Sequence, residues 1–354
     1  MTATERAAAR LAGARDGVLR AGPELIHIDV TNACNLDCTP CWNYSPLLDS
    51  PRSPRWKRGR LDDAVFHRAM AGATRLGCER VIFSGGGEPF LHPGIYDFLG
   101  AAKARGFHVT SITNGTLVDW SRVSAVGVDR LLLNTCGASD ETYVAYHPNQ
   151  PRGAFAALMR NAARVAGRVR INTVQVITRQ NYFELVEMIE LAHRIGAARV
   201  SFKLVSVSQG TERLAPTDVE RQELRETLIP RARARAAALK VRANLDTFAS
   251  QLAGESGAAF PIEEIGCHAG FYYSRIYLDG RVFYCCEHFE VGDLRVAEFD
   301  EIWWSAAYER FRAKMRRGEF LPACHRCGKY DLNFSVAKEL VRVQNVSDAD
   351  LQNP

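Results

Sequence analysis

The chain has 354 residues, enough for one large domain and a smaller one, and its 47% hydrophobic and 24% charged residues are typical of an ordinary globular protein. A net charge of +5 is too small to indicate nucleic-acid binding, and no apolar run is long enough to cross a bilayer. Residues 1–21 contain no apolar signal-peptide core. We therefore expect a cytoplasmic protein without nucleic-acid or membrane partners, whose N-terminal extension is a surface helix or a frayed segment.

Strand-like and helix-like segments alternate in residues 22–215. We expect strands at 25–30, 80–83, 108–112, 130–134, 169–177 and 200–204. We expect helices at 62–76, 95–105, 120–126, 154–166 and 183–195. This alternation predicts an α/β fold in which helices cover a parallel sheet, and six such units form a partial (β/α)6 TIM-like barrel. Chemistry in such folds gathers at the carboxyl ends of the strands.

Three closely spaced cysteines, Cys34, Cys38 and Cys41, follow the first expected strand. Their C-x3-C-x2-C spacing is compact enough to bind one iron–sulfur cube through three of its irons. No fourth cysteine is within reach, so one iron stays open to a small chelating ligand, as in metal sites that keep a position for chemistry. The loop therefore predicts a catalytic iron–sulfur centre.

The second expected strand is followed by a Gly-Gly-Gly-Glu-Pro sequence that includes Gly86, Gly87 and Glu88. Glycines allow the backbone to approach a ligand closely, and Glu88 offers a carboxylate to an ammonium group. A glycine triplet can instead form a tight turn that binds no ligand. Its position after the cysteine loop favours the ligand-binding interpretation.

A second group of cysteines lies in the last third of the chain: Cys267, Cys285, Cys324 and Cys327. We expect a hairpin between the first two of them, because β-forming residues flank the turn sequence Asp279-Gly280. Four thiolates are a complete set of ligands for one zinc ion or one iron–sulfur cluster. Their spacing alone does not decide between the two.

Residues 216–260 are more polar than the preceding segment and predict a helical linker with two helices and a short strand near 239–245. Residues 261–354 are expected to form a small α+β auxiliary domain and a tail. One helix is expected in that domain, at 299–316.

Together, the cysteine loop, the glycine–glutamate motif, the strand–helix units and the four-cysteine extension resemble the radical S-adenosylmethionine (radical SAM) superfamily with a short SPASM/twitch-type auxiliary domain. The resemblance covers about residues 22–335 and points to enzymes that tailor aminoglycoside and nucleoside antibiotics. It implies S-adenosylmethionine (SAM), one SAM-binding 4Fe–4S cluster, one auxiliary 4Fe–4S cluster, and an electron donor such as flavodoxin or ferredoxin. It also implies that the SAM-binding residues are Gly86, Gly87, Glu88, Thr113, Asn134, Ile177 and Arg179.

The reaction implied by the resemblance is hydrogen abstraction by a 5′-deoxyadenosyl radical from an unactivated C–H of a small sugar, cyclitol or nucleoside, in antibiotic biosynthesis. The outcome is either epimerisation or dehydrogenation, an oxidoreductase reaction. Epimerisation needs a hydrogen donor, and the candidate catalytic thiols are Cys136 and Cys286, although a cysteine is as often a packing residue. The alternatives are a sugar-acid decarboxylase, a peptide-modifying maturase and, in another class, a non-catalytic zinc-stabilised binding protein.

Overall fold

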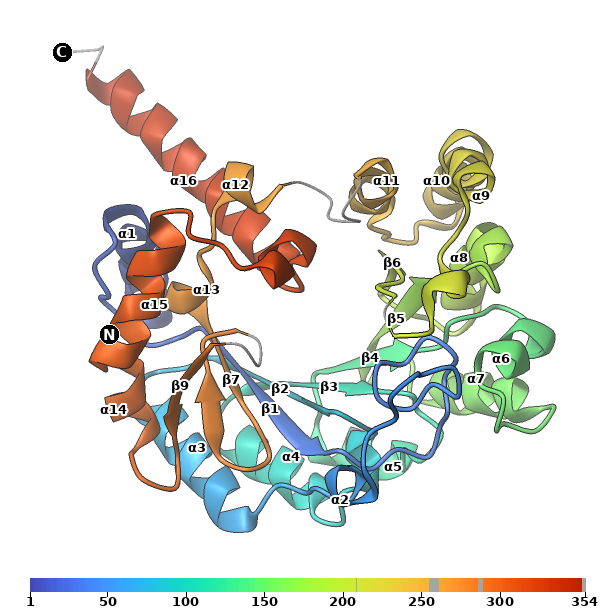
Figure 1. Ribbon diagram of the computed structural model, residues 1–354, viewed down its shortest axis with the longest axis horizontal. Helices are drawn as coiled ribbons and strands as arrows, with labels where there is room; N and C mark the ends of the chain where they lie inside the picture. Colours follow the sequence, from blue (N-terminus) through green and yellow to red (C-terminus); the bar gives the residue numbers. More distant parts are fainter. Residues whose placement is uncertain (208, 255–260, 286–288, 352–354) are drawn as a thin grey trace. The chain divides into compact units, whose positions relative to one another are not determined.

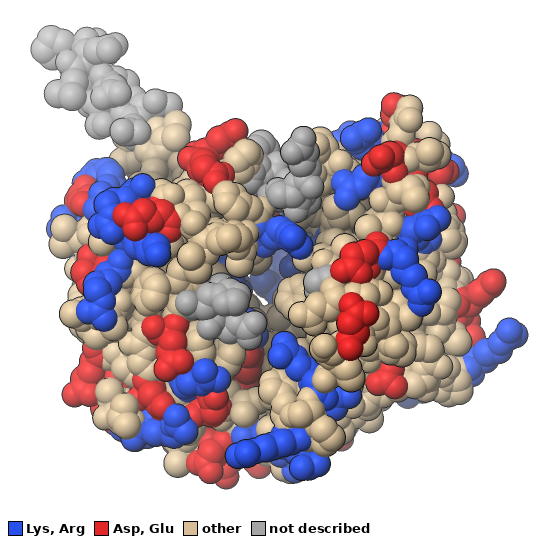
Figure 2. Space-filling model, viewed as in Figure 1, with Lys and Arg blue, Asp and Glu red and all other residues tan. Residues whose placement is uncertain are grey.

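The computed structural model describes residues 1–207, 209–254, 261–285 and 289–351, with side chains described as far as residue 343 (Figure 1). No helix in these ranges is long and apolar enough to cross a membrane. On the face shown in Figure 2, Lys and Arg side chains are interspersed with Asp and Glu side chains. Charge of one sign is therefore not gathered into one large patch on that face.

The chain divides into two compact units. The auxiliary unit comprises Met1–Ile28, Leu61–Val81 and Phe260–Pro354, and the barrel unit comprises Asp29–Arg60 and Ile82–Ala259. The division differs from the four consecutive segments expected from sequence. The reason is that α1 (Ala3–Asp16) packs on α13 (Ala269–Tyr272) and α16 (Tyr330–Leu351), and α3 (Asp63–Arg75) packs on α14 (Phe299–Trp303), all within the auxiliary unit.

The sheet has its first six strands in the order β6-β5-β4-β3-β2-β1, and β3 to β6 pair in parallel. All six match the expected strands to within two residues, which confirms the α/β fold of partial-barrel type. Their bounds are β1 (Leu25–Thr31), β2 (Arg80–Gly85), β3 (His108–Thr113), β4 (Arg130–Asn134), β5 (Arg170–Ile177) and β6 (Arg199–Leu204).

Helices cover one side of the strands in the barrel unit (Figure 1). Alternate residues of β6, Val200 and Phe202, are fully buried in a core shared with Leu185 and Met188 of α8 (Leu185–Arg194). Successive side chains of a strand point to opposite faces. We call the face of β4, β5 and β6 that is turned away from the helices the inner face. The helices are α2 (Pro54–Lys57), α4 (Ile95–Ala104), α5 (Trp120–Val126), α6 (Asp140–Tyr146), α7 (Ala154–Arg164), α8 (Leu185–Arg194), α9 (Asp218–Glu223), α10 (Ile229–Leu239) and α11 (Leu245–Ala253).

The auxiliary unit contains the expected hairpin, with a turn closed by a hydrogen bond from the Gly280 amide to the Tyr277 carbonyl, 2.9 Å. Its first strand, β7, pairs in parallel with Leu25–Ile28 of β1, which belong to the same unit. The elements are α1 (Ala3–Asp16), α3 (Asp63–Arg75), α12 (Ile262–Ile265), α13 (Ala269–Tyr272), β7 (Tyr273–Ile276), β8 (Arg281–Phe283), β9 (Glu290–Asp293), α14 (Phe299–Trp303), α15 (Ala306–Arg316) and α16 (Tyr330–Leu351).

Two expectations for the later part of the chain are wrong. The strand near 239–245 is reduced to a single bridge between Val200 and Ala243, because α10 extends to Leu239 and α11 begins at Leu245. The helix at 299–316 is two helices, because the Ser305 hydroxyl caps a new helix by accepting a hydrogen bond from the Tyr308 amide. A serine hydroxyl that satisfies an otherwise unpaired amide is a typical helix start.

The N-terminal segment is a helix that packs firmly within the auxiliary unit. Arg10 is 2% exposed and donates hydrogen bonds to the Gly22 carbonyl, 2.8 Å, and to Glu79, 2.9 Å. Of the two outcomes left open by the sequence, the helix is therefore the right one. The long helix α16 was not expected at all.

Candidate active site

The three cysteines of the first loop lie close to one another in the barrel unit. Burial is the main cause that raises the pKa of the Cys38 thiol well above its usual range, and the neighbouring Cys41, Cys136 and Cys34 raise it further. Burial also raises the pKa of Cys34 to about 12. Thiols that crowd in this way keep their protons unless a cation binds them, and iron binds cysteine as the thiolate.

The loop backbone also suits a thiolate cluster. The amide of Leu36 donates to the sulfur of Cys34, 3.5 Å, and the amide of Asn43 donates to the sulfur of Cys41, 3.4 Å. Amide donors to cysteine sulfur are one of the means by which proteins tune iron–sulfur clusters. In the part of the chain that the structure describes, no three His, Cys, Asp or Glu side chains converge on one point as ligands of a single ion. A cube does not need such convergence, because each thiolate binds a different iron.

The glycine turn after β2 lies directly against the cysteine loop. The Gly87 amide donates to the Thr31 carbonyl, 3.1 Å, and the Glu88 amide donates to the Ala33 carbonyl, 2.8 Å. A Cβ on Gly85 would collide with the Thr31 carbonyl oxygen, and one on Gly87 with the Ala33 carbonyl oxygen. Gly85 and Gly87 are thus needed for the close contact between the two backbones. Binding of SAM by Gly86 and Gly87 stays a prediction.

Glu88 is the buried centre of this turn, at 2% exposure. Its carboxylate accepts hydrogen bonds from the Thr113 hydroxyl, 2.6 Å, the Asn114 amide, 2.7 Å, and the Phe90 amide, 3.2 Å. Burial raises the pKa of Glu88 to about 7, and the three hydrogen bonds act in the opposite direction. A buried carboxyl with a raised pKa is strongly stabilised as an anion by an ammonium ligand, as the resemblance requires.

We expect the affinity for SAM to rise with pH up to about pH 7, by as much as about tenfold per pH unit. The reason is that the carboxyl of Glu88, with its pKa near 7 rather than the ordinary 4.5, keeps a proton below that pH, whereas an ammonium group requires the anion. Between pH 4.5 and about pH 7 the folded state binds more protons than the unfolded state. The free energy of unfolding of the ligand-free protein therefore falls as the pH rises through this range. Equilibrium dialysis of SAM against the anaerobic protein from about pH 5.5 to about pH 8.5 measures the effect. Glu88→Gln should bind weakly with a flat profile, and an unchanged profile in that variant would refute the assignment.

Two asparagines that the sequence did not single out join the third strand to the cysteine loop. The Asn114 side chain donates to the Asn35 side chain, 3.0 Å, and Asn35 donates to the Thr116 hydroxyl, 2.8 Å. The turn after β3 and the cysteine loop are therefore fixed to each other. Asn35 lies inside the cysteine motif, but nothing in the spacing indicates its partner, which is distant in the sequence.

Tyr44 closes the loop on itself. Its hydroxyl accepts from the Cys34 amide, 3.1 Å, and donates to the Asn32 carbonyl, 2.7 Å. The Lys57 ammonium of α2 lies over the Tyr44 ring, 4.5 Å from its centre. Lys57 thus contacts Tyr44, the aromatic residue whose hydrogen bonds hold the cysteine loop.

Cys136 lies beyond β4, fully buried, with its thiol donating to the Asn134 side-chain oxygen, 2.7 Å. Its φ of +47° is in the left-handed region, which a residue with a side chain seldom adopts. Asn181 maintains this conformation by donating from its side chain to the Cys136 carbonyl, 3.1 Å. Burial raises the pKa of the Cys136 thiol to about 11, so it carries hydrogen at neutral pH.

The other predicted SAM contacts lie apart from this group. Ile177 is fully buried in the core shared with α8. Arg179 is on the surface, where it pairs with Glu220 of α9 at 3.1 Å. The roles of both residues toward SAM stay predictions.

The four auxiliary cysteines belong to the auxiliary unit. Burial raises the pKa of Cys267 to about 12, and Cys327 and Cys324 raise it further. The pKa of Tyr308 is raised mainly by burial, and Cys285 and Cys267 contribute to the rise. Cys267 therefore lies near Cys324 and Cys327, and both Cys267 and Cys285 lie near Tyr308.

Asn333 of α16 supports this second group, although no motif in the sequence indicates it. It is fully buried, donates from its side chain to the sulfur of Cys327, 3.4 Å, and accepts from the His268 amide, 2.8 Å. Cys78, in contrast, is a buried thiol whose sulfur donates to the Glu24 carbonyl, 3.2 Å. Cys286, the second candidate hydrogen donor, lies outside the described residues.

These loops and cysteine groups define a radical SAM enzyme, and the chain belongs to that superfamily. The sequence model of the radical SAM superfamily matches residues 28–208, and that of the SPASM iron–sulfur cluster-binding domain matches residues 267–328. The protein uses SAM with a 4Fe–4S cluster in the barrel and an auxiliary iron–sulfur cluster in the SPASM domain. When bound, SAM and the first cluster supply the one-electron chemistry that begins with cleavage of SAM.

The more particular likenesses are to several radical SAM proteins. The chain is 28% identical to an AdoMet-dependent heme synthase of Methanosarcina barkeri, over 56% of this chain and 56% of that protein. It is 28% identical to the PqqA peptide cyclase of Gluconobacter oxydans, over 50% of this chain and 48% of that protein. It is 26% identical to the mycofactocin maturase MftC of Mycobacterium tuberculosis, over 86% of this chain and 75% of that protein. The chain thus spans about half the length of the first two relatives.

Among solved structures, the chain is similar to Streptococcus suis SuiB bound to the precursor peptide SuiA. The TM-score is 0.62 at 17% identity, over 87% of this chain and 71% of SuiB. At that identity the likeness shows the fold alone.

Proposed function

We propose that this protein is a radical SAM/SPASM enzyme that modifies a peptide. One observation carries the proposal. The similarity to the mycofactocin maturase extends over 86% of this chain, well beyond the length of the radical SAM region at residues 28–208 alone. An external one-electron donor, such as flavodoxin or ferredoxin, is part of the proposal.

The names of other relatives point in the same direction. One relative is a peptide cyclase, and the similar structure SuiB holds a precursor peptide. These names support the peptide alternative better than the small sugar, cyclitol or nucleoside that the sequence favoured. The heme synthase likeness covers 56% of this chain and the peptide cyclase likeness 50%, so both are less extensive than the likeness to the mycofactocin maturase.

We expect a peptide substrate to stimulate formation of 5′-deoxyadenosine and to change its own mass. The test incubates the anaerobically reconstituted protein with SAM, dithionite and synthetic peptides, including those encoded beside the gene. A parallel panel contains aminoglycosides, cyclitols and nucleosides. Stimulation by the small molecules alone would overturn the proposal and restore the first interpretation.

A second candidate, radical-mediated epimerisation, has one observation in its favour. The thiol of Cys136 is close enough to the cluster ligand Cys38 to raise the pKa of that residue, and it remains protonated. A thiol S–H bond is weak enough to donate a hydrogen atom to a carbon radical. Among the residues that the structure describes, none favours dehydrogenation or decarboxylation in a comparable way.

If Cys136 is a hydrogen donor, Cys136→Ala should still cleave SAM but should lose deuterium transfer from heavy water into the product. The physical reason is that only the thiol hydrogen exchanges with solvent and then reaches carbon. Cys78→Ala is the matched control, because Cys78 is an equally hidden thiol of the auxiliary unit. Equal deuterium content from both variants and the unchanged protein would leave Cys136 as a packing residue.

A further inference from the structure

The inner face of β4, β5 and β6 changes character from one end of the strands to the other. At the carboxyl end, near the cysteine loop, it carries the polar Asn134 and Lys203. Farther back it is apolar, and at the amino end it is basic. In register order its residues are Arg130, Leu132 and Asn134 of β4, Arg170, Asn172, Val174 and Val176 of β5, and Arg199, Ser201 and Lys203 of β6.

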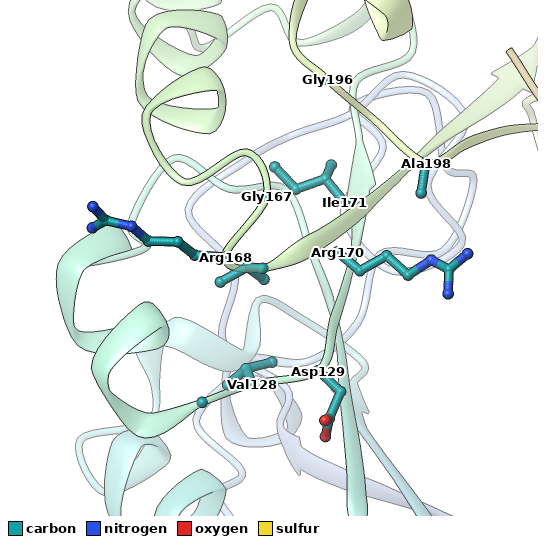
Figure 3. Close-up of a pocket in the computed structure, with 10 residues that line it drawn as sticks. Val128, Asp129, Gly167, Arg168, Arg170, Ile171, Gly196 and Ala198 are labelled. Atoms are coloured by element: carbon teal, nitrogen blue, oxygen red, sulfur yellow. The ribbon is translucent and has the colours of Figure 1, made fainter. Parts of the chain in front are cut away.

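The orientation of these side chains follows from strand alternation. The intervening residues Leu133 and Phe202 are fully buried on the helix side. Figure 3, a view of a cavity of about 420 Å³ at the amino ends of the same strands, shows Arg170 and Ile171 pointing to opposite sides of β5. Arg130 and Arg170 are direct register partners, as are Asn172 and Arg199. The basic end is therefore one continuous surface.

Two polar groups at this end have no partner within the described residues. Asn172 is only 8% exposed, yet its side-chain oxygen accepts no hydrogen bond. The buried Nε of Arg199 donates none. Buried polar groups are almost always paired in proteins, so a donor and an acceptor left open side by side indicate a ligand that supplies both. A peptide carboxylate with a neighbouring N–H has this combination.

We propose that Arg130, Asn172 and Arg199 bind a carboxylate of the peptide substrate, the side chain of an aspartate or a glutamate. Arginine is the residue best suited to a planar carboxylate, because its N–H groups form a fork that matches the two oxygens. The Asn172 oxygen accepts an N–H of the same peptide. This inference rests on the proposed peptide-modifying function.

The strand geometry also gives the position of this carboxylate. Arg199 and Lys203 are four residues apart on β6, which at roughly 3.3 Å per residue separates the basic end from the carboxyl end by about 13 Å. An extended peptide spans that distance in about four residues. We therefore place the acidic group about four residues from the residue that reacts. The apolar part of the inner face between the two ends, with Leu132 and Val174, lies along the intervening segment.

The first test needs no peptide. The holoenzyme is treated with phenylglyoxal, which modifies accessible arginines, in the presence of N-acetyl-glutamate or N-acetyl-glutamine, and each site is quantified by mass spectrometry. We expect the carboxylate probe to slow modification of Arg199 and Arg130 at least about threefold relative to the amide probe. Arg168, which points the other way in Figure 3, is the internal control and should be modified at one rate throughout. Equal rates at Arg199 with both probes would overturn the inference.

The second test uses two pools of labelled synthetic decapeptides that carry either Asp and Glu or Asn and Gln at the same positions. We expect the acidic pool to bind the unchanged protein more tightly, and Arg199→Gln to weaken that binding about tenfold or more. Arg199→Lys should recover part of the loss, and Arg168→Gln should bind normally. Binding of both pools with no preference would overturn the carboxylate site while the peptide function stands. Protection by N-acetyl-glutamate without binding of either pool would support the carboxylate site and count against the peptide function.

Discussion

Replacement of Cys34, Cys38 and Cys41 together by alanine is expected to abolish cleavage of SAM and to halve the iron content, from about eight to about four irons per chain. The barrel thiols and the auxiliary thiols lie in different units, so loss of one set should leave the other able to bind its cluster. Anaerobic reconstitution followed by iron analysis and detection of 5′-deoxyadenosine measures both effects.

The matched variant for this experiment is Cys324→Ala with Cys327→Ala. It should also contain about four irons, but they should be those of the SAM-binding cluster, and SAM should still perturb the spectrum of the reduced protein. A colourless protein that binds zinc in place of iron would contradict the radical SAM assignment and support the zinc-stabilised alternative.

The change Gly87→Ala is expected to destabilise the protein by about 3 kcal/mol or more and to lower the iron content of the barrel site. The added methyl group would collide with the backbone carbonyl of Ala33 in the cysteine loop. A backbone carbonyl cannot rotate away from the methyl group as a flexible side chain can. The loop must move, and the hydrogen bond from the Glu88 amide to the same carbonyl is then strained.

Gly100→Ala is the control for that prediction. Gly100 lies within α4, and a Cβ there meets nothing within 4 Å. Because alanine is a better helix former than glycine, this change should stabilise the protein by about 0.5–1 kcal/mol. Anaerobic urea unfolding followed by circular dichroism compares the two variants. Equal stabilities would mean that the glycine turn tolerates a side chain and that its role is limited to the ligand.

The sheet of the barrel unit was predictable because it depends on local pattern. Apolar runs with the period of a strand alternate with helix-length amphipathic segments, and a parallel sheet is the fold that buries both. Where the local pattern predicted the wrong element, contacts between distant segments determined the structure. The segment near 239–245 is rich enough in apolar residues for a strand. Within the described residues its pairing with β6 is limited to one bridge at Ala243 and hydrogen bonds with Arg242 and Asn244, because helices begin and end on both sides of it.

For the SAM-binding region, the sequence indicates candidate ligands but not the residues that support them. The cysteine spacing and the Gly-Gly-Glu sequence are local, and they carried the superfamily resemblance. Two of the partners of Glu88, Thr113 and Asn114, lie at the end of the next strand, and Asn35 bonds to Thr116, 81 residues away in the sequence. Contacts of that kind depend on the register of neighbouring strands and leave no local pattern.

By itself, the sequence determined the two cysteine groups, the glycine turn and the order of strands and helices, since each depends on residues that are neighbours in the chain. Only the tertiary structure decided that Asn172 and Arg199 lie side by side with unpaired polar atoms on the inner face. It also decided that Cys136 is buried beside Asn134 in a strained conformation, and that Asn333 supports an auxiliary cysteine. The physical reason is the same in each case: hydrogen bonding and burial between distant segments arise only when the sheet and its helices have packed.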